Sequence, residues 1–174
     1  MIVIDLVRNA VAGVMLVLAA LTSAAAAEAL PKPANKPILE IKGKISRTNA
    51  ENNTAEFDRA LLETIGVQQI QTSTPWTDGE PVFEGVLMRD LMRYVGASGE
   101  SVTAVALNDY KVTLPASDFT KYPVLLAFKM NGEVLRVRDK GPLWIIYPQD
   151  QFPEIKDKSV HRKWVWQIKE FRVE

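Results

Sequence analysis

Apolar and polar positions alternate with a period of two over several short stretches, which predicts β-strands. These stretches are residues 38–44, 67–73, 101–107, 110–114, 123–130 and 163–173. A continuous apolar run at residues 143–147 predicts a further strand that is buried on both faces. Asn131-Gly132 supplies the two positive-φ positions of a tight hairpin turn. We therefore expect residues 125–130 to pair with residues 134–137.

Helical spacing of apolar residues occurs in two places. The first predicted helix begins at an N-cap Asn53 in a capping box and ends at Gly66. The second follows residues 83–85 and ends at Gly96, and residues 115–122 predict a short helical turn. Predicted strands outnumber helices, which indicates an α+β fold with a mixed sheet or a folded pair of sheets.

The first residues have the layout of a secretory signal peptide. Residues 10–27 carry no charge, follow Arg8 and end in small residues. The alternative is a retained membrane anchor, which needs about 20 strongly apolar residues, whereas residues 22–27 are Thr, Ser and Ala. We expect a signal peptide at residues 1–27, export to the periplasm, a Pro-rich extended tether at residues 28–37 and one domain at residues 38–174.

Composition excludes several kinds of chemistry. The chain has 21 basic and 21 acidic residues, one His and no Cys. A neutral domain without a basic run lacks the field that attracts nucleic acid, so we expect no nucleic-acid partner. The lack of Cys excludes disulfides, thiolate nucleophiles and Cys-ligated metals, and a single His excludes a multi-histidine metal site. A site made of carboxylates stays open.

No enzyme class follows from residue spacing. His161 lies in a basic loop without a carboxylate to orient it, which favours a surface position. No glycine-rich phosphate loop occurs. Acidic residues are present, but the sequence fixes no pair at the separation that glycoside hydrolysis needs.

Ring, amide and charged side chains gather instead at the ends of predicted strands. These side chains are Trp76, Asn108, Asp109, Tyr110, Asp139 and Trp144. The candidate ligand-binding residues are Trp76, Asn108, Tyr110, Asp139, Lys140 and Trp144. Stacking on Trp or Tyr, together with a carboxylate that accepts two parallel N–H bonds, suits a flat heterocycle such as a purine or a pterin. Two alternatives stay open: a charged turn before a core strand at residues 138–140, and a Trp76 ring that packs over the edge of the core.

The order of short motifs resembles a known family. The motifs are Pro75-Trp76, Gly85-Val86-Leu87 with Asp90-Leu91, Gly96-Ala97, Asn108-Asp109-Tyr110, Leu125-Leu126-Ala127, Asn131-Gly132, Gly141-Pro142-Leu143 with Pro148, and Lys163-Trp164-Val165. In this order they resemble the molybdopterin-binding domain of the sulfite-oxidase fold, over nearly all of residues 38–174. The resemblance implies that fold, with mixed β-sheets and a few short helices.

The departures from the family pattern bear on function. The resemblance implies a molybdenum-binding Cys near the end of the second strand, which corresponds to residues 71–73, where this chain has none. It also implies an Asn or His followed by an Arg around the Gly-Pro-Leu element, and these positions align with Asp139 and Trp144. Replacing Arg by Trp removes an anion clamp and adds a stacking surface. A plain pterin therefore becomes a better ligand than a phosphorylated, metal-bearing molybdopterin.

The pattern is similar to stand-alone periplasmic pterin-sensing proteins of the PruR type. This resemblance implies a soluble, non-catalytic receptor that reports pterin to an inner-membrane partner controlling cyclic-di-GMP. We hypothesise that Trp144, with Trp76 or Tyr110, stacks on the pterin, that Asp139 accepts its N–H groups, and that Asn108 and the backbone near Lys140 read its other polar atoms. The alternatives are a molybdopterin-dependent oxidoreductase without the usual Cys ligand, and an interaction module with an empty pocket.

Overall fold

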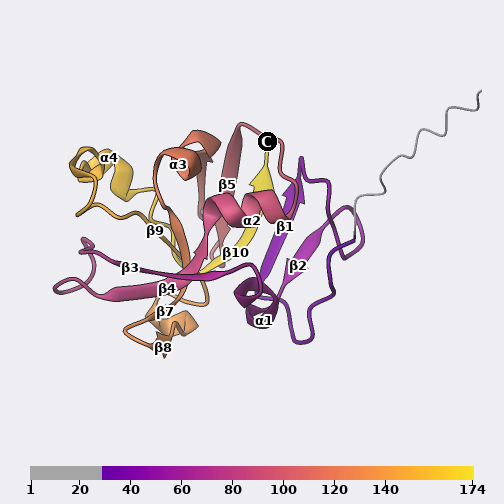
Figure 1. The fold of residues 1–174 in the computed structure, drawn as a ribbon, viewed down its shortest axis with the longest axis horizontal. Coiled ribbons are helices and arrows are strands. Elements are labelled where there is room, and N and C mark those ends of the chain that lie inside the picture. Colours follow the sequence, from indigo (N-terminus) through magenta and orange to yellow (C-terminus); the bar gives the residue numbers. More distant parts are fainter. Residues whose placement is uncertain (1–28) are drawn as a thin grey trace, which may run out of the picture.

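Two five-stranded sheets organise the computed structural model, which describes residues 29–174 (Figure 1). The first sheet has the order β2-β1-β10-β5-β6, and in the second β3-β4-β7-β8 are joined by β9, which pairs with β7. The first sheet consists of β1 (Leu39–Gly43), β2 (Ala55–Phe57), β5 (Ser101–Ala106), β6 (Lys111–Pro115) and β10 (Ile168–Val173). The second consists of β3 (Val67–Gln71), β4 (Val82–Leu87), β7 (Leu125–Met130), β8 (Glu133–Val134) and β9 (Trp144–Ile146).

Short helices connect these strands. They are α1 (Arg59–Glu63), α2 (Met88–Tyr94), α3 (Ala116–Lys121) and α4 (Lys158–His161), with 3₁₀ turns at Val137–Asp139 and Pro153–Ile155. The strand pair β1–β10 is parallel and the others are antiparallel. The prediction of an α+β fold with mixed sheets and a few short helices is confirmed. Among residues 29–174, no helix has the length and apolar character that crossing a membrane requires.

One hydrophobic core joins the two sheets. Ile41, Phe57 and Phe171 from the first sheet and Phe83 and Leu126 from the second have no exposed surface. Each is an inward position of a strand, so burying these side chains stabilises both sheets together, at roughly 1.5–3 kcal/mol for each side chain. The core therefore fixes the strand ends from which the polar candidates project.

Several local predictions are confirmed. Asn131 and Gly132 have φ values of 51° and 78° in the β7–β8 hairpin. Residues 143–147 are buried throughout, and the short helical turn predicted at residues 115–122 is α3. The hairpin is shorter than expected, because β8 has two residues and a 3₁₀ turn begins at Val137.

The predicted first helix begins in the wrong place. Asn53 has a φ of 53° in a tight turn, and the following residues form β2, which pairs with β1. The helix cap is Asp58, whose carboxylate accepts the N–H of Leu61 at 2.8 Å. Phe57 and Ala55 are buried on the inward face of a strand, so the pairing with β1 decides the conformation that helical spacing had suggested.

Two other boundaries differ. Residues 83–85, expected to lead into a helix, belong to β4, and the helix α2 starts only at Met88. The last strand, predicted from residue 163, begins at Ile168 because Gln167 has a left-handed φ of 54° that ends the extended alternation. Residues 163–167 are therefore an irregular segment.

The N-terminal predictions are only partly within the described chain. The signal peptide predicted at residues 1–27 lies outside the described residues. Residues 29–37, which lie in the predicted extended tether, contact the domain: Leu30 is 4% exposed, its N–H donates to the Thr48 carbonyl at 3.1 Å, and the Asn35 backbone N–H donates to the Asp58 carboxylate at 2.7 Å. This segment is therefore part of the packed domain.

Candidate functional site

A cavity of about 280 Å³ lies where three connections meet. These are the loop between β3 and β4, the β5–β6 turn and the connection that runs from the end of α4 through the irregular segment to β10. Its lining residues are Trp76, Ala106, Asn108, Tyr110, His161, Arg162, Trp164, Val165, Trp166 and Gln167. Rings and aliphatic groups dominate, two carboxamides and one guanidinium are present, and no carboxylate lines the cavity.

Trp76 lies at the centre of a cluster of rings. The backbone N–H of Trp76 donates to the Thr74 hydroxyl at 3.0 Å, and the hydroxyls of Thr74 and Thr77 lie 2.8 Å apart. These contacts hold the loop in a tight turn. The ring centroid is 5.3 Å from that of Trp166 and 6.0 Å from that of Trp164. Since Trp76 is still 36% exposed, it contributes an accessible indole surface to the cavity.

The irregular segment before β10 supplies the other two indoles. Trp166 forms an isolated bridge with Trp144, and the Ile145 N–H donates to the Val165 carbonyl at 2.9 Å, so this segment is held against β9. Trp164 is 1% exposed, and its Nε1 has no hydrogen-bond partner among residues 29–174. An unpaired buried N–H costs about 1–3 kcal/mol, and such groups are usually satisfied by water or a ligand.

His161 is fixed by a polar network behind the cavity. Gln149 Nε2 donates to the Ser73 carbonyl at 3.0 Å and to its Oγ at 3.1 Å, which leaves Gln149 Oε1 to accept. The His161 Nε2 lies 3.2 Å from that oxygen and therefore carries the proton in this contact. In the neutral ring Nδ1 is then the acceptor, which gives the cavity wall a defined hydrogen-bonding character.

Asp150 anchors the same network to the end of β3. Its carboxylate accepts the Ser73 N–H at 2.5 Å and the Thr72 hydroxyl at 3.1 Å, and Lys156 Nζ is 3.0 Å away. Burial alone would raise the pKa of Asp150, but the bonds from Ser73, Lys156 and Thr72 outweigh it and hold the pKa well below its usual range. The carboxylate is therefore ionised at neutral pH and fastens the loop beside the cavity.

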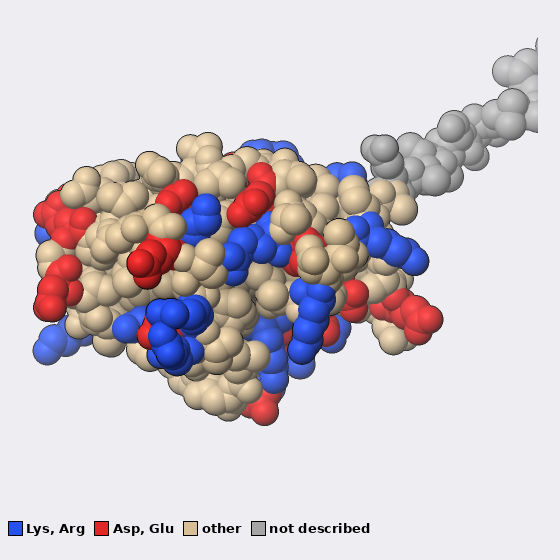
Figure 2. Space-filling model, turned by 90° about the horizontal axis from the view of Figure 1, so that it is seen from below, with Lys and Arg blue, Asp and Glu red and all other residues tan. Residues whose placement is uncertain are grey.

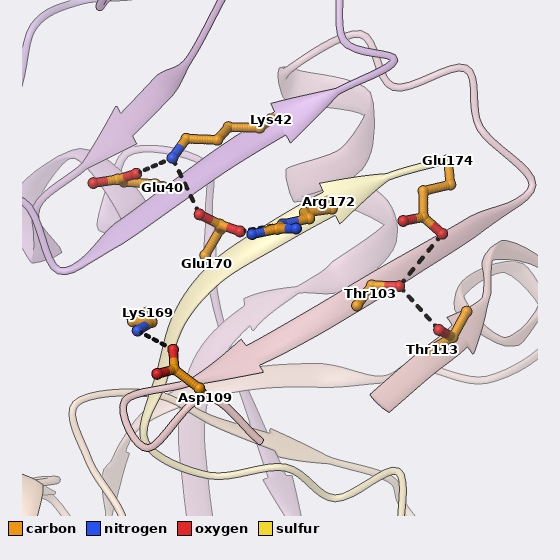
Figure 3. Close-up of polar contacts among 9 residues, drawn as sticks. All are labelled: Glu40, Lys42, Thr103, Asp109, Thr113, Lys169, Glu170, Arg172 and Glu174. Carbon is orange, nitrogen blue, oxygen red and sulfur yellow. Dashed lines mark hydrogen bonds and ion pairs between the residues drawn. The ribbon is translucent and has the colours of Figure 1, made fainter. Parts of the chain in front are cut away.

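Three of the predicted site residues meet in this cavity: Trp76, Asn108 and Tyr110. Tyr110 is 52% exposed at the rim, and its N–H donates to Asn108 Oδ1 at 3.2 Å. The neighbouring Asp109 turns away and pairs with Lys169 at 2.8 Å (Figure 3). The carboxylate of this turn is thus outside the cavity lining.

The predicted role of Trp144 as the stacking surface needs correction. This ring has no exposed surface, packs edge-on against Phe83 at a centroid distance of 5.4 Å, and donates its Nε1–H to the Trp164 carbonyl at 3.2 Å. It does not line the cavity but lies in the core, 6.4 Å from the Trp76 ring. The accessible rings are its neighbours Trp76 and Trp166.

Asp139 and Lys140 lie in a separate groove near the 3₁₀ turn after β8. Arg136 Nε is 3.0 Å and Arg138 Nε is 3.4 Å from the Asp139 carboxylate, and these bonds outweigh slight burial to lower the pKa of Asp139. Lys140 Nζ lies 5.4 Å from the centre of the Trp144 ring. Neither side chain joins the cavity, although the Lys140 carbonyl accepts the Gln167 N–H at 3.2 Å.

Sequence reasoning missed most of the cavity lining. It assigned His161 to the surface and residues 163–167 to a regular strand, so Trp164, Trp166 and Gln167 were not considered as a site. The available signal was the Trp-x-Trp pair itself, which places two indoles close together beside the only His. Among residues 29–174, no group of three or more His, Asp or Glu side chains is arranged to hold a metal ion.

Opposite charges are interspersed on the face seen in Figure 2, in keeping with the formally neutral composition of the chain. On the sheet formed by β1, β10 and β5, Lys42 pairs with Glu40 at 2.6 Å and with Glu170 at 3.1 Å, and Arg172 also contacts Glu170 (Figure 3). These ion pairs satisfy the charges of the sheet surface. The polar groups around the cavity are a different set.

Comparison with known proteins agrees with this architecture. The crystal structure of the sulfane dehydrogenase SoxCD from Paracoccus pantotrophus superposes with a TM-score of 0.55 at 17% sequence identity, over 78% of this chain and 37% of that chain. The present chain thus matches little more than a third of that solved chain. A search of curated proteins found no significant match. The family described as "Oxidoreductase molybdopterin binding domain" matches residues 46–171. The chain belongs to this family of molybdopterin-binding domains with the sulfite-oxidase fold.

Proposed function

We propose that this protein is a non-catalytic receptor that binds a pterin in the cavity between Trp76, Trp166 and Tyr110. The observation that carries the proposal is the clustering of three indoles and a phenol around a small cavity with carboxamides at its edge. Aromatic rings favour flat heterocycles through stacking, and amides read the polar edges of such rings. The ligand would stack on Trp76 and Trp166, because Trp144 is buried in the core and has no accessible surface.

The size and charge of the cavity favour a small ring system. At about 280 Å³ it is near the lower end of ligand pockets, which span roughly 300–1,000 Å³. A bicyclic heterocycle suits this volume better than a dinucleotide. Arg162 at the rim is the single permanent charge of the lining, so a neutral or weakly acidic ligand is preferred over a cationic one.

The side chains present do not fit the metal part of a molybdenum cofactor. The chain contains no Cys, and the position that corresponds to the family's thiolate is held by Thr72 and Ser73, whose groups are bonded to Asp150 and Gln149. A soft metal favours a thiolate, and hydroxyls that are already hydrogen-bonded are poor substitutes. The pterin ring, in contrast, needs only the aromatic and amide groups that the cavity has.

The proposals on export and on the partner rest on the sequence and on the resemblance. We propose that residues 1–27 direct the chain to the periplasm, and that the pterin-bound form signals to an inner-membrane protein with a periplasmic domain, one that controls cyclic-di-GMP. Support comes from the layout of the first residues and from the similarity to PruR-type pterin sensors.

Pterin binding is tested by titrating the exported, purified protein with pterin and following both heat and indole fluorescence. We expect saturable binding with a stoichiometry of one and quenching, because the ligand contacts Trp76 and Trp166. The absence of binding at millimolar pterin would rule out the receptor proposal. Native mass spectrometry of protein isolated from the periplasm would also reveal a ligand that remains bound during purification.

The second candidate function is a molybdopterin-dependent oxidoreductase that lacks the Cys ligand, and the family match favours it. It predicts stoichiometric molybdenum in protein purified from cells supplied with molybdate, measured by elemental mass spectrometry. A bound pterin without molybdenum supports the receptor, and bound molybdenum supports the oxidoreductase.

A further inference from the structure

Two carboxamides line the cavity where the β5–β6 turn lies beside the segment before β10. Asn108 and Gln167 both line it, and the Leu107 N–H donates to the Gln167 carbonyl at 2.8 Å. This backbone bond places the β5–β6 turn directly beside the segment before β10. The two side chains therefore come from neighbouring backbone positions at the same edge.

One polar atom of each carboxamide already makes a hydrogen bond, and this bond fixes the orientation of the amide. Asn108 Oδ1 accepts the Tyr110 N–H at 3.2 Å, and Gln167 Nε2 donates to the Val137 carbonyl at 2.6 Å. Only the amide nitrogen donates and only the amide oxygen accepts. The ends left over are the Asn108 Nδ2 donor and the Gln167 Oε1 acceptor, and neither has a hydrogen-bond partner among residues 29–174. Turning either amide over would break the bond that holds it.

We propose that this donor and acceptor read the lactam edge of the ligand, which is a ring N–H beside a ring carbonyl. Gln167 Oε1 accepts the ring N–H, and Asn108 Nδ2 donates to the adjacent carbonyl oxygen. The inference rests on the proposed pterin-binding function and assigns its specificity: the site takes 4-oxo heterocycles such as pterins. A 4-amino ring presents an amino donor next to a bare ring nitrogen, which opposes both amides.

The lack of a carboxylate in the lining also favours a 4-oxo ring over a 4-amino ring. A 4-aminopteridine protonates more readily than a pterin, and its cation is best held by an ionised carboxylate. The nearest acidic side chain of the turn, Asp109, is 79% exposed and paired with Lys169. The cavity edge therefore has neutral groups that match a neutral lactam.

The test compares pterin with 2,4-diaminopteridine, two flat bicycles of the same size that stack equally well. Isothermal titration of the purified full chain should give a dissociation constant for pterin at least about tenfold lower, because the diamino ring leaves two polar groups mismatched. Equal affinities would overturn the lactam assignment while leaving the receptor proposal intact. Binding of neither compound would instead overturn the receptor proposal, and this inference with it.

Asn108→Asp sharpens the test because it changes the free donor into an acceptor and keeps the oxygen that accepts the Tyr110 N–H. Pterin affinity should fall at least about tenfold, and the preference for pterin over 2,4-diaminopteridine should be lost or reversed. Asn131→Asp is the matched control: it lies outside the cavity, and its Oδ1 likewise accepts a backbone N–H, from Val82 at 2.9 Å. If Asn108→Asp folds with the melting temperature of the control and keeps the wild-type preference, the assignment is wrong.

Discussion

The cavity and the charged segment at residues 136–140 each contain some of the residues that the sequence analysis placed in a single site, and the two regions differ in how their polar groups are satisfied. In the charged segment, Asp139 is paired with Arg136 and Arg138, and the three side chains are 48–71% exposed. In the cavity, ring faces and two amide ends are left without partners. A ligand site needs a concave apolar surface with a few unmet polar groups. Density of charge is a poorer guide, because neighbouring charges neutralise one another.

A second contrast lies inside the ring cluster, where Trp144 is buried and Trp76 is exposed. The largest expected effect is on stability, from Trp144→Ala. Removing a side chain without exposed surface, together with its bond to the Trp164 carbonyl, should lower the free energy of unfolding by about 3–5 kcal/mol. Chemical denaturation measures this loss. Trp144→Phe should lose less, and an unchanged midpoint for the Ala variant would mean that this ring is not a core residue.

Trp76→Ala should affect binding more than folding. Loss of one stacking surface costs about 1–3 kcal/mol, which raises the dissociation constant for pterin roughly 5- to 150-fold. The fold should remain cooperative, with a smaller loss of stability than in Trp144→Ala, because Trp76 is 36% exposed. Calorimetric titration gives the affinity and denaturation gives the stability. Unchanged affinity would remove Trp76 from the binding site.

Asp150→Asn tests the anchor beside the cavity through its pH dependence. The pKa of Asp150 is lowered in the folded protein relative to about 3.9 in the unfolded chain, so its stabilising effect is fully present above about pH 4 and is lost as the pH falls through the folded value. The substitution should cost about 1–2 kcal/mol at pH 7. The difference from wild type should shrink toward pH 3. Denaturation at both pH values measures it, and a pH-independent difference would contradict the role of the charge.

Asp139→Asn should have the smallest effect. Its carboxylate lies in the exposed charged segment and outside the cavity, so pterin affinity and the melting temperature should both stay at wild-type values. Calorimetric titration and thermal unfolding check this. A clear loss of pterin binding would mean that the ligand binds at the charged segment and not in the cavity.

The sequence determined the elements that depend on near neighbours. Alternation and turn residues located β1, β3, β5, β6 and β7, the buried run around β9, and the Asn131-Gly132 turn, because side-chain direction in a strand and positive φ in a turn are local properties. The α+β class followed from their number and order. The sequence also proposed Trp76, Asn108 and Tyr110, which line the cavity, since each follows the end of a strand in a polar loop.

Tertiary structure decided what depends on distant parts of the chain. Residues 55–57 became a strand because β1 offered an edge to pair with, and the left-handed Gln167 placed Trp164 and Trp166 on the cavity wall. The same packing buries the Trp144 ring in the core. The apolar run at residues 143–147 had already indicated that Trp144 is buried, and the site hypothesis set that signal aside. For Trp76, Trp164 and Trp166, which lie outside such a run, exposure to a ligand depends on which strands and loops cover each ring, and the local pattern does not specify them.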